Sequence, residues 1–142
     1  KKMNRKKLML DVAMKEYGVQ EIKGGQHNPR IVEYFKTVGH EWVDNDELAW
    51  CAAFVGFCLE KIGIRSTKKL NARSYLEFGT RTYDPVIGDV AVFSRGNSPV
   101  YGHVAFYVGE TDGFYLVLGG NQSNQVQISA YAKSRLLEFR SY

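Results

Sequence analysis

The spacing of apolar residues changes near the middle of this chain, and that change limits the fold more than any other feature. Up to about residue 78, apolar residues recur every three or four positions, as on one face of a helix. From residue 89 onward they alternate with polar residues, as in half-buried strands. Helices followed by a run of strands predict an α+β domain, with N-terminal helices packed on a C-terminal antiparallel sheet.

Apolar spacing and terminal glycines predict where the helices lie. The first has Leu10, Ala13, Met14 and Tyr17 on one face and ends at Gly18. Three further helices are expected, each preceded by polar residues and followed by glycine, over residues 29–38, 51–62 and 72–78. About five short strands are expected in the second half, over residues 89–93, 103–110, 114–119, 125–130 and 135–140.

Length and charge limit the domain organisation and the partners. A chain of 142 residues without an internal linker or repeat predicts one domain, residues 1–142. The net charge is +4, and five of the 19 basic residues lie in residues 1–7, which we interpret as a flexible basic tail. Without zinc-finger spacing, RNA-binding aromatics or a Walker loop, a nucleic-acid partner is not expected. Because the sequence has no long apolar segment, we expect no membrane insertion, and the basic start without an apolar run predicts no signal peptide in this chain.

The two cysteines are predicted to be free thiols with different roles. Cys51 and Cys58 lie on one predicted helix, about 10 Å apart at 1.5 Å rise per residue, which is beyond disulfide reach. Cys58 is interpreted as a core residue. Cys51 opens the helix, where unpaired amides and the helix dipole favour a thiolate. Cys51 is therefore a candidate nucleophile.

One predicted hairpin gives the candidate base a neighbour. The loop 111–113 ends in glycine, as a three-residue hairpin loop requires, and this centres the strand pairing on Asp112. Glu110 then faces Phe114, and outward along the strands His103 faces Asn121, provided that the register continues through the glycine pair before Asn121.

These residues form a predicted Cys-His-Asn triad. Cys51 would attack a carbonyl, His103 would accept and return the proton, and Asn121 would orient the imidazole. The backbone N–H of Cys51 would donate to the oxyanion. Further oxyanion or groove residues are expected among the neighbours of the triad, namely Asn45, Trp50, Tyr101 and Gly102. A zinc site built from Cys51, His103 and a loop histidine, His27 or His40, is the disfavoured alternative.

Several motifs together resemble a known superfamily. They are Trp-Cys-Ala-Ala-Phe-Val at 50–55, Gly-Asp-Val-Ala-Val-Phe at 88–93, Gly-His-Val-Ala-Phe-Tyr-Val-Gly at 102–109 and Leu-Gly-Gly-Asn-Gln at 118–122. In these the chain is similar to the CHAP and NlpC-type cysteine peptidoglycan hydrolases. The segments 18–24 and 28–31 resemble a phage- and prophage-associated subgroup. The resemblance implies a papain-like fold and matches Cys51, His103 and Asn121 to the nucleophile, the base and the third polar residue.

The resemblance also implies a function. It implies hydrolysis of an amide in bacterial wall peptides, without a cofactor, by an endopeptidase or N-acetylmuramoyl-L-alanine amidase. The partner would be peptidoglycan, reached outside the cytoplasm or delivered by a virion, with phage tail proteins as further partners. Trp50 and Gly119 replace acidic residues found in many relatives, so the bond that is cut stays open. Calcium is not expected from Asp44 and Asp46.

Two alternatives remain from other functional classes. One is an acyltransferase or secreted toxin that uses the same acyl-enzyme on another amide. The other is a non-catalytic wall-binding module of a phage particle, in which Cys51 would have no enhanced reactivity.

Overall fold

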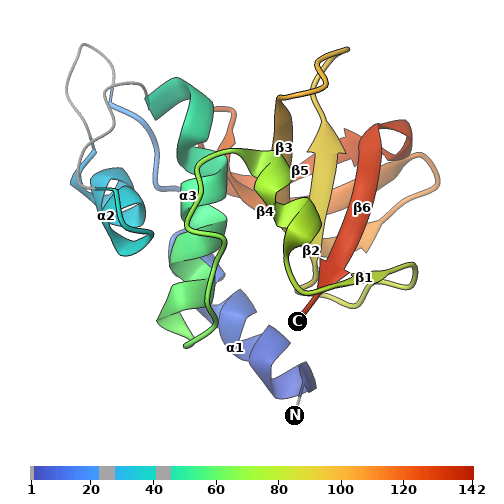
Figure 1. Ribbon diagram of the computed structural model, residues 1–142, viewed down its shortest axis with the longest axis horizontal. Coiled ribbons are helices and arrows are strands. Elements are labelled where there is room, and N and C mark those ends of the chain that lie inside the picture. Colours follow the sequence, from blue (N-terminus) through green and yellow to red (C-terminus); the bar gives the residue numbers. More distant parts are fainter. Residues whose placement is uncertain (1, 23–27, 41–45) are drawn as a thin grey trace.

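In the described part of the chain, three α-helices precede an antiparallel sheet, so the predicted α+β class is confirmed (Figure 1). This computed structural model describes the backbone of residues 2–22, 28–40 and 46–142, and the side chains of 4–22, 28–40 and 50–142. The helices are α1 (Lys2–Met14), α2 (Pro29–Thr37) and α3 (Asp46–Lys61). The predicted fourth helix is a 3-10 helix, η1 (Ala72–Glu77), and a second one, η2 (Lys133–Arg135), precedes the last strand.

Among the described residues, the sheet has six strands where about five were expected. They are β1 (Thr80–Thr82), β2 (Val90–Ser94), β3 (Gly102–Glu110), β4 (Phe114–Gln122), β5 (Gln125–Ala132) and β6 (Leu136–Ser141). Their order is β1-β6-β2-β3-β4-β5, and all neighbours are antiparallel. The unexpected strand is β1, a short polar segment without an apolar pattern.

Helix α3 lies between α2 and the sheet (Figure 1). Residues 50–59 are all buried, because this helix is apolar on every side and is covered on every side. Cys58 is among them, so its interpretation as a core residue is confirmed. Both cysteines are free thiols.

The sheet buries apolar side chains on both faces. Val104 and Phe106 of β3 belong to the main core with the helices, whereas Ala105 and Tyr107 belong to a second cluster. Side chains alternate between the two faces of a strand, so His103 lies on the face of the second cluster.

The N-terminal residues form a helix, so the prediction of a flexible tail over residues 1–7 is wrong for residues 2–7. In α1, Lys6 Nζ lies 2.7 Å from Asp89 Oδ1 and donates to Ser141 Oγ at 3.1 Å. The buried stripe of this segment is Lys6, Met9, Ala13 and Glu16. Apolar spacing missed it because charged residues stand at both of its ends.

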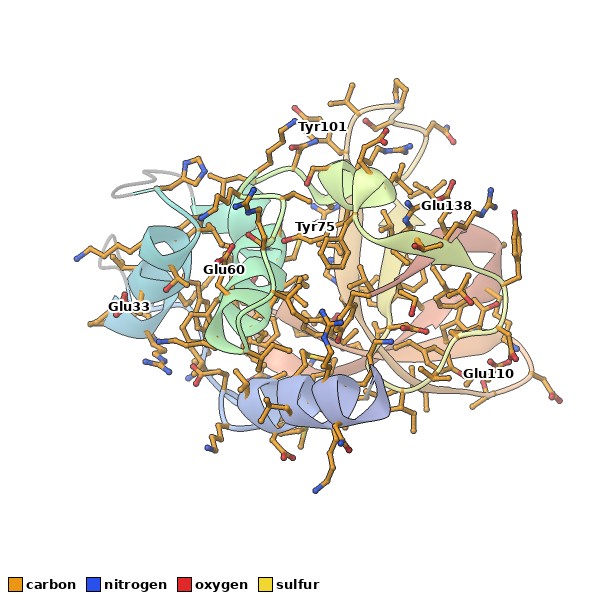
Figure 2. All side chains as sticks on the ribbon, turned by 60° about the horizontal axis from the view of Figure 1, so that its bottom comes forward. Glu33, Glu60, Tyr75, Tyr101, Glu110 and Glu138 are labelled. Carbon is orange, nitrogen blue, oxygen red and sulfur yellow. The ribbon has the colours of Figure 1, made fainter. Side chains whose placement is uncertain are left out.

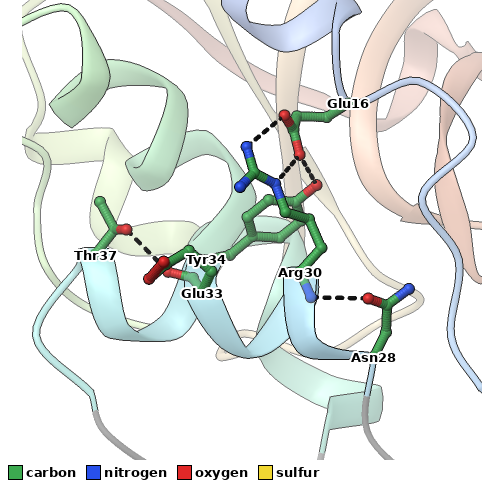
Figure 3. Close-up of polar contacts among 6 residues, drawn as sticks. All are labelled: Glu16, Asn28, Arg30, Glu33, Tyr34 and Thr37. Carbon is green, nitrogen blue, oxygen red and sulfur yellow. Dashed lines mark hydrogen bonds and ion pairs between the residues drawn. The ribbon is translucent and has the colours of Figure 1, made fainter.

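Glu16, in the segment after α1, forms hydrogen bonds with two residues of helix α2 (Figure 3). Its carboxylate accepts hydrogen bonds from Arg30 Nε at 2.6 Å and from the Tyr34 hydroxyl at 2.8 Å. Burial opposes its ionisation, but the hydrogen bonds from Arg30 and Tyr34, together with the charges of Arg30 and Lys61, outweigh that effect and lower the pKa of Glu16. The predicted cap of α2 is confirmed, since Asn28 Oδ1 accepts from the Arg30 amide at 2.8 Å. Within the described ranges, no helix has the length and apolarity that a bilayer span requires.

Candidate functional site

Cys51 lies in the second turn of α3, because that helix begins at Asp46. The prediction that Cys51 opens the helix is therefore wrong. Only the first four amides of a helix lack partners, and the dipole effect falls off within the first turn, so the argument for a thiolate at Cys51 loses its basis. The same holds for its N–H as an oxyanion donor. The other expected donor, Asn45, lies outside the described residues.

The Cys51 thiol is buried against β3. Cys51 is only 4% exposed, and this burial raises the pKa of its thiol. The backbone amide of Val104, the charge of Arg95 and the amides of Ala52 and of Cys51 itself favour the thiolate, but burial outweighs their effect on the pKa. The sulfur therefore lies beside Val104, the residue that directly follows His103. In the resting protein Cys51 is a protonated thiol.

His103 is held by Gln122, a residue that the sequence did not point to. His103 is 1% exposed, and its Nε2 lies 2.9 Å from Gln122 Oε1. Gln122 Nε2 donates to two carbonyls, those of Val117 at 3.1 Å and Gln127 at 2.7 Å. Both amide hydrogens are thus used, so Oε1 must accept and His103 Nε2 must carry the hydrogen.

The other ring nitrogen of His103 is available as a base. Nδ1 is buried and has no hydrogen-bond partner among the residues that the structure describes. Burial lowers the pKa of His103 to about 4, against the effect of the Gln122 hydrogen bond, and the charges of Arg95 and Arg135 lower it further. At neutral pH the imidazole is therefore neutral, with its proton on Nε2 and a free lone pair on Nδ1.

Tyr131 of β5 covers one face of the imidazole. Its ring centroid lies 4.7 Å from that of His103, with 9° between the planes. It also stacks on Phe93 at 5.0 Å. Burial first, and the Cys51 sulfur second, raise the pKa of Tyr131, so this side chain lies near both members of the candidate pair. Sequence analysis missed it, because an aromatic residue on a strand carries no functional signal by itself.

The predicted hairpin register holds only in part. Phe106 faces Leu118 as expected, but nearer the turn Glu110 faces Tyr115 rather than Phe114. At the other end, the β4–β5 pairing is irregular between Gly119 and Gln122. This bulge prevents the simple extension of the register to His103 and Asn121.

Because of the bulge, Gln122 rather than Asn121 lies beside the His103 imidazole. Asn121 has a left-handed backbone, φ 57°, and is half-buried. The prediction that Asn121 hydrogen-bonds the imidazole is wrong, because Gln122 occupies that position. A signal was present in the two glycines before Asn121, since glycine in a strand often marks a bulge.

Gly119 and Gly120 make room for the residues on both sides of the bulge. A Cβ on Gly119 would lie 2.5 Å from Gln122 Oε1, and one on Gly120 would lie 2.8 Å from the Trp50 ring. Larger residues at these two positions would displace the carboxamide that holds His103 or the indole beside Cys51.

The predicted groove residues have different positions. Trp50 is wrong as a groove residue, because it is fully buried and its Nε1 donates to Glu21 Oε1 at 2.6 Å. Tyr101 is 58% exposed and precedes β3, at the end remote from Glu110 (Figure 2). Gly102 pairs with Ser94 at the start of β3. Tyr101 and Gly102 thus flank His103 and stay predicted groove residues.

A hollow of about 700 Å³ opens beside the β4–β5 turn. Its lining is mainly polar and consists of Gln20, Glu21, Ile22, Asn28, Ser123 and Asn124. Glu21 bonds the indole that precedes Cys51, and Ser123 directly follows Gln122, so this hollow adjoins the site. Among the residues that the structure describes, no three His, Cys, Asp or Glu side chains gather as a metal site. Asp44 lies outside them.

Residues 43–121 match the family model of the CHAP domain, and this stretch contains Cys51 and His103. A comparison with curated proteins gives no match. The fold is similar to that of three solved structures. The Resuscitation Promoting Factor Interacting protein RipA has a TM-score of 0.63 at 16% identity, over 99% of this chain and 63% of that protein.

The second structure is a Staphylococcus aureus protein of the NLP/P60 family, with a TM-score of 0.59 at 16% identity, over 97% of this chain and 41% of that one. The third is the P60 domain of an antigen from M. avium paratuberculosis, with a TM-score of 0.61 at 12% identity, over 99% of this chain and 95% of that one. The chain thus spans less than two thirds of the first two proteins. At these identities the similarity shows the fold alone, and that fold is papain-like.

Proposed function

This chain belongs to the CHAP domain family, whose members are in general cysteine peptidoglycan hydrolases, and we propose that it cleaves an amide bond of bacterial peptidoglycan through an acyl-enzyme on Cys51. The observation that carries this proposal is the arrangement of His103. Gln122 holds the proton on Nε2, and Nδ1 keeps a free lone pair beside the strand residue that contacts the Cys51 sulfur.

The resting protonation states support a concerted first step. Burial keeps Cys51 as a thiol and His103 as a neutral imidazole. As the sulfur attacks the carbonyl carbon, Nδ1 accepts the thiol proton, and the imidazolium then donates it to the leaving amine. A water molecule that transfers a proton to Nδ1 attacks the thioester, which releases the carboxylic acid and restores the thiol.

Gln122 has the positioning role in this proposal. A neutral amide that accepts from Nε2–H selects the tautomer in which Nδ1 is the base, as the third residue of a triad does. Tyr131 holds the ring plane from one face. Asn121 belongs to the bulge that places Gln122, and the role that the sequence predicted for it is the competing assignment, which a variant at each of the two positions separates.

The proposed place of action is the bacterial cell wall, and delivery by a phage particle stays a prediction from the resemblance. The bond that is cut, either within a stem peptide or crosslink or between N-acetylmuramic acid and L-alanine, is decided by the products. The experiment is mass spectrometry of the fragments released from purified peptidoglycan.

Cys51→Ala is the test variant, and Cys58→Ala is its matched control, because both thiols are buried in the same helix. We expect fragments from the wild type and the control, and none from Cys51→Ala. Release by Cys51→Ala would overturn the proposal. Products joined to an added amine instead of water would identify an acyltransferase.

A further inference from the structure

Three arginines gather at the end of the sheet that holds His103. Arg73 Nε donates to the Tyr101 carbonyl at 2.9 Å, and Arg135 Nη2 donates to the Ser94 carbonyl at 2.9 Å. Arg95 directly follows β2 and is exposed. Tyr101 and Ser94 belong to the chain segments on either side of the loop between β2 and β3, so all three cations lie around this loop.

These arginines have no acidic partner among the described residues. Elsewhere in the molecule, Arg30 pairs with Glu16, and both Arg81 and Arg140 pair with Glu138. At the candidate site, by contrast, the guanidinium hydrogen bonds of Arg73 and Arg135 go only to backbone carbonyls in the part of the chain that is described. The positive charge of this end is therefore not compensated there.

The charge of Arg135 lies close to the reacting groups. Its Cζ is 4.9 Å from the centroid of the Tyr131 ring, and that centroid is 4.7 Å from the His103 ring. The guanidinium is thus within about 10 Å of the imidazole, no farther than the Debye length in about 0.1 M salt. Arg95 acts electrostatically on both Cys51 and His103.

The guanidinium groups of Arg95 and Arg135 both have N–H groups that can donate to a ligand. Arg135 uses Nε and Nη2 for the Ser94 carbonyl, which leaves Nη1. Arg95 makes no hydrogen bond through its guanidinium to any described residue, so its N–H groups are available to a ligand. Guanidinium groups bind carboxylates through paired, charge-assisted hydrogen bonds.

We propose that Arg95 and Arg135 form a binding site for a carboxylate of the substrate, so that the preferred substrate is a peptide with a free acidic group near the amide that is cut. This inference rests on the proposed function, because it concerns the substrate of the same site. It also couples binding to chemistry. A bound carboxylate offsets the positive charge that opposes protonation of His103, and so favours the imidazolium formed in the first step.

The first test measures the charge around Cys51 without using hydrolysis. Iodoacetate and iodoacetamide alkylate a thiol by the same displacement of iodide, but only iodoacetate carries a negative charge. The ratio of their rates at Cys51 therefore reports the local potential, and any change in thiolate fraction cancels. The Cys58→Ala background restricts the reaction to one cysteine.

We expect the ratio of iodoacetate to iodoacetamide rates to fall several-fold in Arg95→Gln and Arg135→Gln, and further in the double variant. Arg81→Gln removes the same charge at the far edge of the sheet, on β1, and should leave the ratio unchanged. An equal ratio in the parent protein and in all four variants would overturn the proposed carboxylate site. The melting temperature of each variant verifies that it is folded.

The second test compares two stem-peptide substrates that differ only in one group, a free carboxylate in one and a carboxamide in the other. We expect the wild type to prefer the carboxylate in kcat/KM by at least about ten-fold, the lower end of what a charge-assisted hydrogen bond contributes, and the double variant to lose this preference. Cleavage of both peptides without preference would overturn this inference and leave the proposed function intact. If the wild type cuts neither the peptides nor peptidoglycan, the proposed function fails, and the alkylation ratio still decides whether the arginines attract an anion.

Discussion

Replacing Gln122 by methionine tests the residue on which the proposed site depends. Methionine has a similar length but cannot make the three hydrogen bonds of the carboxamide, which are 2.9 Å to His103 Nε2, 3.1 Å to the Val117 carbonyl and 2.7 Å to the Gln127 carbonyl. The substitution leaves the buried Nε2–H without an acceptor, and the neutral imidazole then loses its preference for that tautomer.

The expected magnitude follows from these contacts. A buried polar group left without its partner costs about 1–3 kcal/mol. Only the His103 bond bears on catalysis, so kcat/KM should fall by about 5- to 150-fold, at 1.4 kcal/mol for each factor of ten. The loss of the two hydrogen bonds to the carbonyls of Val117 and Gln127 lowers the free energy of unfolding instead, and a urea titration measures that loss separately.

Two control variants make the assay decisive. Gln125→Met removes an amide from the same hairpin whose hydrogen bond goes to Gln127 Oε1 at 2.9 Å rather than to His103. Asn121→Gly keeps the left-handed backbone at φ 57° and removes the residue predicted from the sequence. We expect both to retain most of the wild-type kcat/KM. Full activity in Gln122→Met, with a large loss in Asn121→Gly, would refute the reasoning and return the positioning role to Asn121.

Three further predictions follow from the buried groups. Because burial lowers the pKa of His103 from 6.5 to about 4, the unfolded chain binds a proton that the native protein does not, so stability is full above pH 6.5 and falls toward pH 4 by about 3 kcal/mol. Urea unfolding across this range should show that loss in the wild type, and a loss of the same size in His103→Gln would contradict the assignment. Tyr131→Ala should lower kcat/KM about two- to ten-fold by removing the stacked ring, whereas Tyr131→Phe should not, and equal losses would assign the effect to the hydroxyl. Asp89→Asn should lower the free energy of unfolding by about 3–5 kcal/mol, because it leaves the buried Lys6 ammonium without its counter-charge. A loss below about 1 kcal/mol, typical of an exposed ion pair, would contradict that prediction.

The fold class was predictable because its main signals are local. The change of apolar period locates the helices and five of the strands, and the cap and the apolar stripe predict α2 to within one residue. The buried face of α1 was not predictable from apolar spacing, because Lys6 and Glu16 are satisfied by partners distant in sequence. Strand β1 carries no apolar pattern, and only its pairing with β6 makes it a strand.

The candidate site was predictable only where one residue carries the signal. Cys51 and His103 stand in distinctive motifs, and the contact of the Cys51 sulfur with Val104 places them at the same end of the sheet. Gln122 was missed because its position depends on a bulge, and a bulge shifts every residue beyond it. The start of α3 before Cys51 likewise changes the expected thiolate into a buried thiol, which no pattern of apolar residues reveals.

The protonation state of His103 in the resting protein tests the central claim most directly. Two-dimensional ¹⁵N–¹H NMR of histidine-labelled protein distinguishes the two neutral tautomers and the imidazolium. We predict a neutral ring at pH 7 with its hydrogen on Nε2, loss of that signal in His103→Gln, and protonation only near pH 4. A ring with its hydrogen on Nδ1, or an imidazolium at pH 7 paired with a Cys51 thiolate, would contradict the proposed site.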